Sequence, residues 1–374
     1  MSRKRVLFLV SSLQFGGAEI QTVNLLNRLR CDDLEIHLAH FLGGGPLQAR
    51  LDPGAIAGLH DLGKRGRFDL RFLWRLAGLL TRLQPHAVVA VALYPAFLAN
   101  VLRLACRLRF RMAVILHAAM ACNAFEHRVN RLLYRWVADV AERTIYVCRK
   151  QMDYWAEVYG VHLRNASCIY NGVDHTFFAP RRSGEPVSPL RAELGIGPEA
   201  SVICICAALR PEKRHQDLID AFAILQRDLP NARLLILGDG PERGSVEQRI
   251  AARGLTDRVR ILGFHQDVRP YLEIADLCVL SSATEAFSMA ILEAMSMGKA
   301  IVGPRVGGVT EQVIDGVNGL TYPPGDVAEL AAAMQSILQE GRAAAMGVCS
   351  RARVEELFTL DRMVESYDAL LAAL

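Results

Sequence analysis

Short apolar runs alternate with segments of helical periodicity along the first half of the chain. Runs such as RVLFLV (5–10) end at polar residues or glycines, and in the segments between them apolar side chains recur every three or four positions. This alternation favours a parallel sheet with helices on both faces. The expected strands are 5–10, 34–41, 87–93 and 112–118, and the expected helices include 18–29 and 69–83.

A linker region separates this half from a second stretch of the same alternation. Residues 181–200 contain three prolines, three glycines and mixed charges. We therefore expect two successive doubly wound α/β domains, residues 1–180 and 201–357, with ligands bound beyond the carboxyl ends of the strands in a cleft between the domains. The expected strands of the second domain are 201–209, 232–238, 259–264, 276–282 and 299–304, and its expected helices include 215–229, 244–255 and 310–315.

Composition indicates a globular cytoplasmic protein. The 374 residues are 52% hydrophobic and 22% charged, which suffices for sizeable cores. The apolar stretch 87–102 is interrupted by Pro95 and Asn100, and it is shorter than the ~20 residues of a membrane-spanning helix. Only five apolar residues follow the basic residues 3–5, fewer than the apolar segment of a signal peptide contains, so we expect no signal peptide. The nine cysteines do not have the spacing of zinc ligands. Cys204 and Cys206 alternate along an expected strand, so we expect them to be thiols of the core. Free thiols indicate a reducing compartment.

Charge is divided unevenly between the halves. Residues 1–180 contain 23 Lys and Arg against 13 Asp and Glu, a net +10, whereas residues 181–374 contain 20 against 26, a net −6. Three anionic partners would suit the first half: a membrane surface, a phosphorylated substrate or nucleic acid. No nucleic-acid-binding module is recognisable, so we do not expect nucleic acid.

Two basic segments, 64–82 and 103–111, are candidates for contact with an anionic membrane. The first combines six Lys and Arg with apolar residues at helical spacing, and the second carries four arginines. Such a helix either lies on an anionic bilayer or packs its apolar face on the core and leaves its basic face in solvent. The sequence keeps both alternatives open, so peripheral attachment to the cytoplasmic face of a membrane is an expectation. The apolar residues of the first segment are Phe68, Phe72, Leu76 and Leu79.

The stretch EAFSMAILEAMSMGKAIVG (285–303) places two glutamates eight positions apart in apolar company. Carboxylates in such surroundings are costly unless a partner binds them. Ser288 is a good N-cap for a helix from Met289, and the amides near Phe287, Ser288 and Met289 would then form an anion site. Glu285 and Glu293 would flank that site and accept hydrogen bonds from hydroxyl groups. The alternative is a plain loop glutamate and a partly exposed helical one.

Four segments of the chain resemble, in order, the GT-B glycosyltransferases of family 4, whose donor-site signature is an E-x7-E motif. The matches span nearly the whole chain, and together they are far more specific than any one of them. The resemblance implies two Rossmann-like domains, with a last helix of about 358–374 packed back on the first. The segments are SSLQFGGAE (11–19), NGVDHTFFAP (171–180), AALRPEKRHQDLIDAF (207–222) and 281–326.

The resemblance also implies roles for individual residues. Glu285 matches the glutamate that contacts the donor sugar, and Glu293 matches the one that holds the ribose. Lys213 matches the lysine that neutralises the diphosphate. The family also has an arginine five residues before this lysine. Ala208 stands at that position here, and Arg210, two residues later, is the candidate substitute.

The resemblance also implies which residues lie near the donor and the acceptor. The amides of Phe287, Ser288 and Met289 match those that meet the sugar and diphosphate, with Ser288 in place of the usual glycine. His117 matches a histidine near the sugar and acceptor. Donor contacts from backbone are also expected at Gly16, Gly17 and Gly238.

We therefore expect a retaining glycosyltransferase that uses a nucleotide-sugar donor and a lipid-linked or polysaccharide hydroxyl acceptor. The sequence contains no Asp-x-Asp pair and no ligand-like spacing of cysteine and histidine, so we expect no metal and no other cofactor. Two alternatives stay open. One is a nucleotide-sugar epimerase on the same fold, and the other is a non-catalytic nucleotide-sugar-binding protein.

Overall fold

The chain forms two compact units. The computed structural model describes residues 3–29, 33–66, 69–117, 133–181 and 189–374. The first unit comprises residues 1–172 and 360–374, and the second comprises residues 173–359.

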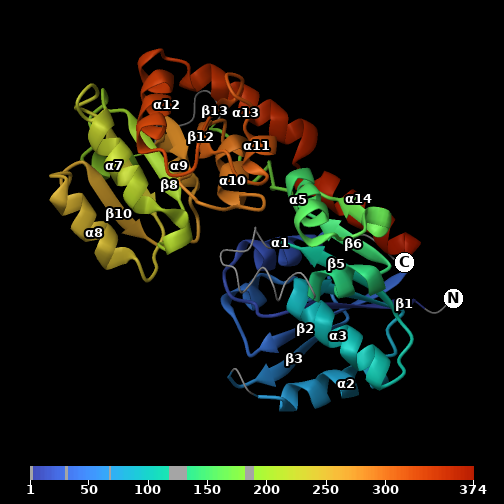
Figure 1. Cartoon of the computed structure of the whole chain (residues 1–374). Helices are drawn as coiled ribbons and strands as arrows, with labels where there is room; N and C mark the ends of the chain where they lie inside the picture. Colours follow the sequence, from blue (N-terminus) through green and yellow to red (C-terminus); the bar gives the residue numbers. More distant parts are fainter. Residues whose placement is uncertain (1–2, 30–32, 67–68, 118–132, 182–188) are drawn as a thin grey trace. The chain divides into compact units, whose positions relative to one another are not determined.

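A seven-stranded parallel sheet organises the first unit (Figure 1). Its strand order is β3-β2-β1-β4-β5-β6-β7, and the order along the chain reverses between β1 and β4, as in doubly wound α/β folds. The strands are β1 (Lys4–Val10), β2 (Leu34–Leu42), β3 (Gly58–Lys64), β4 (Ala87–Val91), β5 (Arg111–Leu116), β6 (Arg143–Tyr146) and β7 (Ala166–Cys168).

Helices cover both faces of this sheet because the apolar side chains of its central strands point both ways. In β1, Val6 and Phe8 belong to the core cluster that includes residues of α1 and α14, whereas Leu7 and Leu9 belong to the cluster that includes residues of α2, α3 and α5. The helices are α1 (Gly17–Leu26), α2 (Arg71–Leu83), α3 (Leu93–Ala105), α5 (Arg149–Tyr159) and α14 (Leu360–Ala373).

The second unit repeats the same topology with six parallel strands in the order β10-β9-β8-β11-β12-β13. Its chain order reverses between β8 and β11. The strands are β8 (Val202–Cys206), β9 (Arg233–Leu237), β10 (Val259–Gly263), β11 (Leu277–Val279), β12 (Ala300–Pro304) and β13 (Gly319–Tyr322). The helices are α6 (Leu190–Glu193), α7 (His215–Leu225), α8 (Arg243–Ala252), α9 (Arg269–Ile274), α10 (Met289–Ser296), α11 (Val309–Gln312), α12 (Val327–Gln339) and α13 (Ala343–Leu357).

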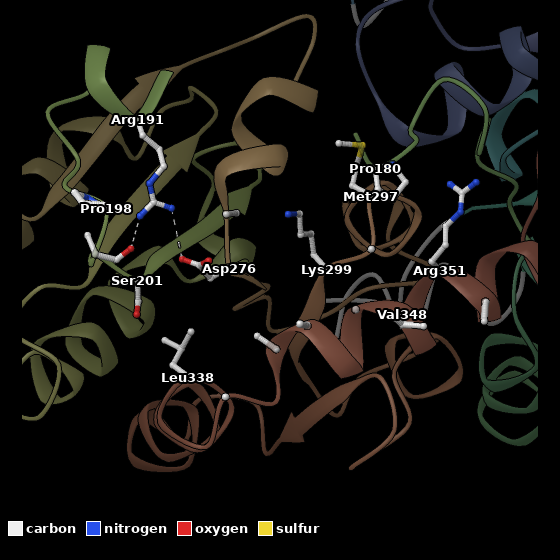
Figure 2. Close-up of a pocket in the computed structure, with 18 of the residues that line it drawn as sticks. Pro180, Arg191, Pro198, Ser201, Asp276, Met297, Lys299, Leu338, Val348 and Arg351 are labelled. Atoms are coloured by element: carbon white, nitrogen blue, oxygen red, sulfur yellow. Dashed lines mark hydrogen bonds and ion pairs between the residues drawn. The ribbon is translucent and has the colours of Figure 1, made fainter. Parts of the chain in front are cut away.

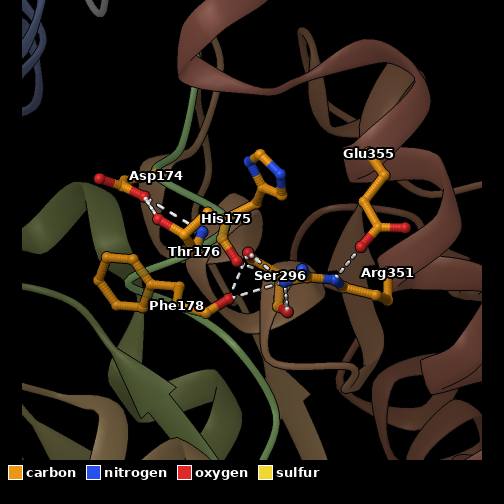
Figure 3. A network of polar contacts seen from close by, with 7 residues as sticks. All are labelled: Asp174, His175, Thr176, Phe178, Ser296, Arg351 and Glu355. Carbon is orange, nitrogen blue, oxygen red and sulfur yellow. Dashed lines mark hydrogen bonds and ion pairs between the residues drawn. The ribbon is translucent and has the colours of Figure 1, made fainter.

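The boundary between the units lies at Gly172 and Val173, earlier than the boundary at residue 180 expected from the sequence. The amide of Val173 donates to the carbonyl of Phe358 at 2.9 Å. Arg351 of α13 donates to the carbonyls of His175 and Phe178 (Figure 3). These tertiary bonds attach residues 173–178 to the second unit, and no local sequence pattern encodes them.

Residues of the expected linker are also part of the second unit. Residues 182–188 lie outside the described part of the chain, and α6 follows them. Arg191 donates to the carbonyls of Gly197 and Ile274, which attaches this stretch to the end of α9.

Within the described ranges no helix combines the length and the apolar character that crossing a bilayer requires. The apolar stretch 87–102 is instead divided between β4 and α3.

Candidate functional site

The point where the strand order reverses in the second sheet lies between β8 and β11. In open parallel sheets, ligands bind beyond the carboxyl ends of the strands at such a point. Two loops leave the sheet there: residues 207–214 after β8 and residues 280–288 after β11. They contain most of the site residues expected from the sequence in this unit.

The loop after β8 ends in one turn of 3-10 helix, Pro211–Lys213, immediately before α7. The amide of Lys213 donates to the carbonyl of Arg210 at 3.0 Å, which fixes the turn. Arg214 then adopts a left-handed conformation with φ of 49°, uncommon for a residue with a side chain, and α7 begins at His215. The sharp reversal keeps Lys213 at the carboxyl edge of the sheet.

An ion pair joins the two loops. Lys213 Nζ lies 2.5 Å from Glu285 Oε1, and Ser282 Oγ donates to the same carboxylate oxygen at 2.7 Å. Ser281 Oγ donates to the carbonyl of Lys213 at 2.7 Å. The side chains of Lys213 and Glu285 are only 23% and 11% exposed, so the pair is partly shielded from water. A cation and a carboxylate therefore meet at the place where the topology predicts a ligand.

The beginning of α10 is fixed by Ser288 and Gln312. Ser288 caps the helix as predicted, since its Oγ accepts the amide of Ile291. The fully buried amide group of Gln312 makes two further bonds: its Oε1 accepts the Ser288 N–H at 3.1 Å, and its Nε2 donates to the Ser288 carbonyl at 2.8 Å. The Ser288 amide, one of the three expected to meet an anion, is thus already bonded to Gln312 in this structure.

A glycine turn supports the loop that carries Glu285. Gly307 has φ of 44°, and a Cβ atom there would lie 1.9 Å from the carbonyl oxygen of Glu285. The next amide, that of Gly308, donates to the carbonyl of Ala286 at 2.8 Å. Only glycine permits this approach, which holds the backbone around Glu285 in place.

The ends of β9 and β10 form a neighbouring part of the same edge. Gly238 has φ of 149°, its amide donates to the carbonyl of Gly263, and a Cβ at this position would lie 1.9 Å from the carbonyl oxygen of Ala207. Phe264 follows β10 directly and is 57% exposed. An exposed aromatic ring beside a closely packed backbone provides a flat apolar surface, and the sequence analysis did not identify it.

His215, the first residue of α7, is a second feature that the sequence analysis missed. It is 2% exposed, and within the described part of the chain neither ring nitrogen has a hydrogen-bond partner. Burial, with a smaller effect of the nearby Lys213, lowers its pKa to about 4. The ring is therefore neutral at physiological pH and adds no charge beside Lys213.

The other expected residues of this unit lie along the same loops. Arg210 is exposed, and its guanidinium makes no hydrogen bond or ion pair with any described residue. Glu293 lies in the second turn of α10 and is partly exposed. The structure thus brings Lys213 and Glu285 into contact and leaves Arg210 directed toward solvent.

Gly16, Gly17 and His117 belong to the first unit, at the carboxyl edge of its own sheet. Gly16 caps α1 with extended backbone, and Gly17 begins the helix after β1. His117 follows β5 directly, and burial lowers its pKa to about 4, so that its ring is neutral at physiological pH.

A cavity of about 860 Å³ opens at the opposite edge of the second sheet (Figure 2). Ser201, Asp276 and Lys299 line it, and they mark the amino-terminal ends of β8, β11 and β12. Lys299 donates from Nζ to the carbonyl of Glu273, and burial lowers its pKa. Because ligands of parallel sheets bind at the carboxyl edge, we assign the candidate site to the Lys213–Glu285 loops and not to this cavity.

A search of the described residues finds no group of three or more His, Cys, Asp or Glu side chains that could hold a metal ion. Cys204 on β8 and Cys278 on β11 are buried, Cys206 at the end of β8 is partly buried, and burial raises the pKa of Cys278.

Two curated proteins are similar to this chain in sequence. N-acetyl-alpha-D-glucosaminyl L-malate synthase of Bacillus anthracis is 31% identical over 208 residues, which cover 55% of this chain and 53% of the relative. Alpha-D-kanosaminyltransferase of Streptomyces kanamyceticus is 35% identical over 153 residues, which cover 40% of this chain and 39% of the relative. The chain thus matches about half or less of the length of these curated relatives.

Among solved structures, Anabaena HepE in complex with UDP and glucose has a TM-score of 0.87 to this chain at 23% identity, with 100% of both chains covered. This likeness confirms the GT-B fold that the sequence resemblance implied.

Two family models match successive parts of the chain. "Glycosyltransferase Family 4" matches residues 15–177, and "Glycosyl transferases group 1" matches residues 188–351. The matches occur in the order of the two units and leave only short segments uncovered. The chain therefore belongs to glycosyltransferase family 4 and has the GT-B architecture of two Rossmann-like units.

Proposed function

We propose that this chain transfers a sugar from a nucleotide-sugar donor to a hydroxyl acceptor, with the donor bound by the second unit. The observation that carries the proposal is the Lys213–Glu285 pair where the strand order reverses between β8 and β11. The ammonium group of Lys213 can pair with a diphosphate, and the carboxylate of Glu285 can accept hydrogen bonds from sugar hydroxyls. The curated relatives named above are a synthase and a glycosyltransferase, and HepE was solved with UDP and glucose.

In the proposed complex the donor diphosphate separates the ion pair. Lys213 would turn from Glu285 to the phosphate oxygens, and Arg210, which has no partner among the described residues, would join it. Glu285, held by Ser282, would then accept hydrogen bonds from hydroxyls of the donor sugar. Glu293, one turn inside α10, is assigned to the ribose by family resemblance.

The backbone near the Gly238–Gly263 contact and the Phe264 ring are assigned to the nucleotide base. An exposed phenyl ring can stack on a base, a contact worth about 1–3 kcal/mol per base. In the first unit, Gly16, Gly17 and His117 are assigned to the sugar and acceptor side. The amides of Phe287 and Met289 complete the proposed donor contacts.

The proposed reaction needs no protein nucleophile. The bond between the anomeric carbon and the diphosphate oxygen breaks, and its electron pair stays with the diphosphate. The acceptor oxygen bonds to the same face of the anomeric carbon, and its proton passes to the departing phosphate oxygen, which retains the configuration. Lys213 and Arg210 stabilise the charge that develops on the leaving group, and the site orients the reactants.

We also propose that transfer is independent of metal ions, because two cationic side chains stand where a divalent ion would otherwise neutralise the diphosphate. Activity should therefore persist in excess EDTA. Loss of turnover in EDTA that magnesium or manganese restores would contradict this assignment.

The acceptor is proposed to be a lipid-linked glycan or a growing polysaccharide at the cytoplasmic face of a membrane. This proposal rests on family resemblance and on the basic first half of the chain.

The experiment that tests the proposed function is a panel of nucleotide sugars. Thermal unfolding of the whole chain identifies the donor, because a ligand at about 100 times its dissociation constant stabilises the protein by about 2.7 kcal/mol. The donor is then incubated with and without acceptor mixtures, and the products are analysed by mass spectrometry and NMR. Transfer to an acceptor with retained configuration supports the proposal. Isomerised donor in the absence of acceptor indicates an epimerase, and binding without any turnover indicates a non-catalytic protein.

A further inference from the structure

Helix α2 has two faces of opposite character. Its apolar residues Phe72, Leu76, Leu79 and Leu80 are buried in the core of the first unit and cannot contact another surface. On the other face Trp74 is 82% exposed, and Leu70, the N-cap residue that precedes the helix, is 65% exposed. A large aromatic and an aliphatic side chain thus stand together in solvent on one side of a helix.

Basic side chains surround this exposed pair. Arg71 and Arg82 are exposed on α2, and Arg65 lies just before it. None of the three guanidinium groups makes a hydrogen bond or ion pair with a described residue. Positions 71, 74, 75, 78 and 82 recur at helical spacing, so Trp74, Arg71 and Arg82 point to the same side.

Other cations nearby are engaged within the unit. Arg75 donates to the carbonyls of Leu62 and Gly63 at 2.8 and 3.1 Å. Lys64 Nζ donates to Tyr94 Oη at 3.1 Å. Two carboxylates, Asp61 and Asp69, reduce the local charge but do not cancel it, since five Lys and Arg lie between residues 61 and 83 of the described chain. Arg67 and Phe68, part of the same expected segment, lie outside the described residues.

The second basic segment is less available. Arg103 donates to the carbonyls of Phe110 and Val140, and Arg111 donates to the carbonyls of Ala373 and Leu374. Both are therefore used to hold the first unit together. The other two arginines of this segment, Arg107 and Arg109, are exposed, and their side chains have no hydrogen-bond or ion-pair partner among the described residues.

We propose that the outer face of α2, defined by Leu70, Arg71, Trp74 and Arg82, docks on an anionic phospholipid bilayer, with Trp74 inserted at the level of the headgroups. A tryptophan has an apolar body and one N–H donor, which suits the interface between hydrocarbon and water. Unpaired guanidinium groups suit lipid phosphates, and an anionic surface attracts them over about a Debye length. The buried face of α2 limits insertion to Trp74 and Leu70, so binding is peripheral and reversible. This inference does not depend on the proposed function.

Vesicle binding by the whole chain tests the proposal. Vesicles of phosphatidylcholine with about 30 mol per cent phosphatidylglycerol should bind the protein at low salt, and pure phosphatidylcholine should bind it far less. The chain has three tryptophans: Trp74 is exposed, Trp155 is buried and Trp136 is partly buried. Binding should therefore shift the emission of the wild type to shorter wavelength.

Two variants and two matched controls make the test specific. The double variant Arg71→Gln, Arg82→Gln should lower partitioning about thirtyfold, since each basic residue near an anionic surface contributes about fivefold. Its control, Arg107→Gln with Arg109→Gln, removes the same charge and should change partitioning little. Trp74→Ser should weaken binding roughly tenfold and remove the spectral shift, whereas Val348→Ser, at an exposed apolar residue of α13, should do neither.

Three results would overturn the proposal. One is the absence of wild-type binding to the anionic vesicles at low salt. The second is equal binding to neutral vesicles. The third is an equal loss of binding in the α2 variant and in its charge-matched control. Circular dichroism of each variant excludes misfolding as the cause.

Discussion

At the scale of single residues, the candidate site depends on buried polar contacts that lock the loop backbones. Gln312 supplies both a donor and an acceptor to Ser288, and it is 0% exposed. An amide side chain that bonds both backbone groups of one residue fixes that residue's position and orientation. Gln312 is thus a positioning residue for the start of α10 and, through it, for Glu285 and Glu293.

Replacing Gln312 should affect both stability and donor use. Gln312→Leu leaves the buried N–H of Ser288 without its partner, at a cost of about 1–3 kcal/mol. The Ser288 carbonyl loses one of two donors and keeps the amide of Leu292 at 3.2 Å. With the helix start displaced, kcat/KM for the donor should fall at least about tenfold. Unfolding measurements and donor kinetics would check this, with the partly exposed Gln335→Leu on α12 as the matched control. Normal kinetics in a folded Gln312→Leu protein would contradict the positioning role.

Such contacts could not be predicted from the sequence, because Ser288 and Gln312 are 24 positions apart and only the fold brings them together. The Ser288 cap, in contrast, was predicted correctly because capping depends on neighbours three residues away. The same distinction applies to Lys213 and Glu285. Their positions after two strands could be inferred from the sequence pattern, but their contact could not.

At the scale of elements, α13 attaches the segment that enters the second unit. Arg351 directs its Nη1 at the carbonyls of His175, Phe178 and Ser296, at 2.8, 2.9 and 2.8 Å, and its Nε donates to Glu355 (Figure 3). Ser296, the last residue of α10, also donates to the carbonyl of Phe178. One side chain thus connects α13, the end of α10 and the incoming chain.

Arg351→Met should therefore destabilise the second unit. Three carbonyls lose a charged donor, and hydrogen bonds to charged groups contribute about 1.5–3 kcal/mol. Denaturant unfolding should show a clear loss of stability, whereas Glu355→Gln, which removes only a half-exposed partner, should cost less than about 1 kcal/mol. Equal effects of the two substitutions would show that the carbonyl contacts contribute little.

Strands and helices themselves were predicted with mixed success, for identifiable reasons. β1 and β9 are continuous apolar runs bounded by polar residues or glycine, and they lie close to their expected positions. β3 (Gly58–Lys64) contains Asp61, His60 and two glycines, so its sequence did not suggest a strand. It forms because β2 offers it an edge with which to pair.

At the scale of the whole molecule, acid sensitivity follows from three histidines that are buried or partly buried: His60 and His117 in the first unit and His215 in the second. Burial lowers the pKa of His117 and His215 to about 4, and it also lowers the pKa of His60. Below about pH 6.5 the unfolded chain binds protons at these residues while the folded chain does not. The contribution of these histidines to folding stability should therefore be fully present well above about pH 6.5 and be lost as the pH falls toward about 4.

For His117 and His215 the slope between about pH 6.5 and about pH 4 should approach about 1.4 kcal/mol per pH unit for each residue. Denaturant unfolding at about pH 7.5 and about pH 5 would measure it. His215→Leu should flatten the dependence of the second unit, and the exposed His162→Gln should leave it unchanged. A stability that does not change between these pH values would contradict the burial of these rings.

The central claim for the molecule is that the loops after β8 and β11 bind the two ends of the donor: Lys213 its diphosphate and Glu285 its sugar. Within the structure the two side chains pair with each other, so each can be removed separately to ask which part of the donor loses its partner. Glu212, beside Lys213 and partly exposed, provides a control in the same loop.

The most direct measurement combines calorimetric binding and turnover for Lys213→Ala, Glu285→Ala and Glu212→Ala with the donor identified by the panel. Lys213→Ala should weaken binding of the nucleoside diphosphate at least about tenfold, the effect of one lost charged hydrogen bond, and leave binding of the nucleoside nearly unchanged. Glu285→Ala should nearly abolish sugar transfer in a folded protein, and Glu212→Ala should resemble the wild type. Wild-type turnover in folded Glu285→Ala, or equal loss of nucleoside and diphosphate binding in Lys213→Ala, would contradict the account.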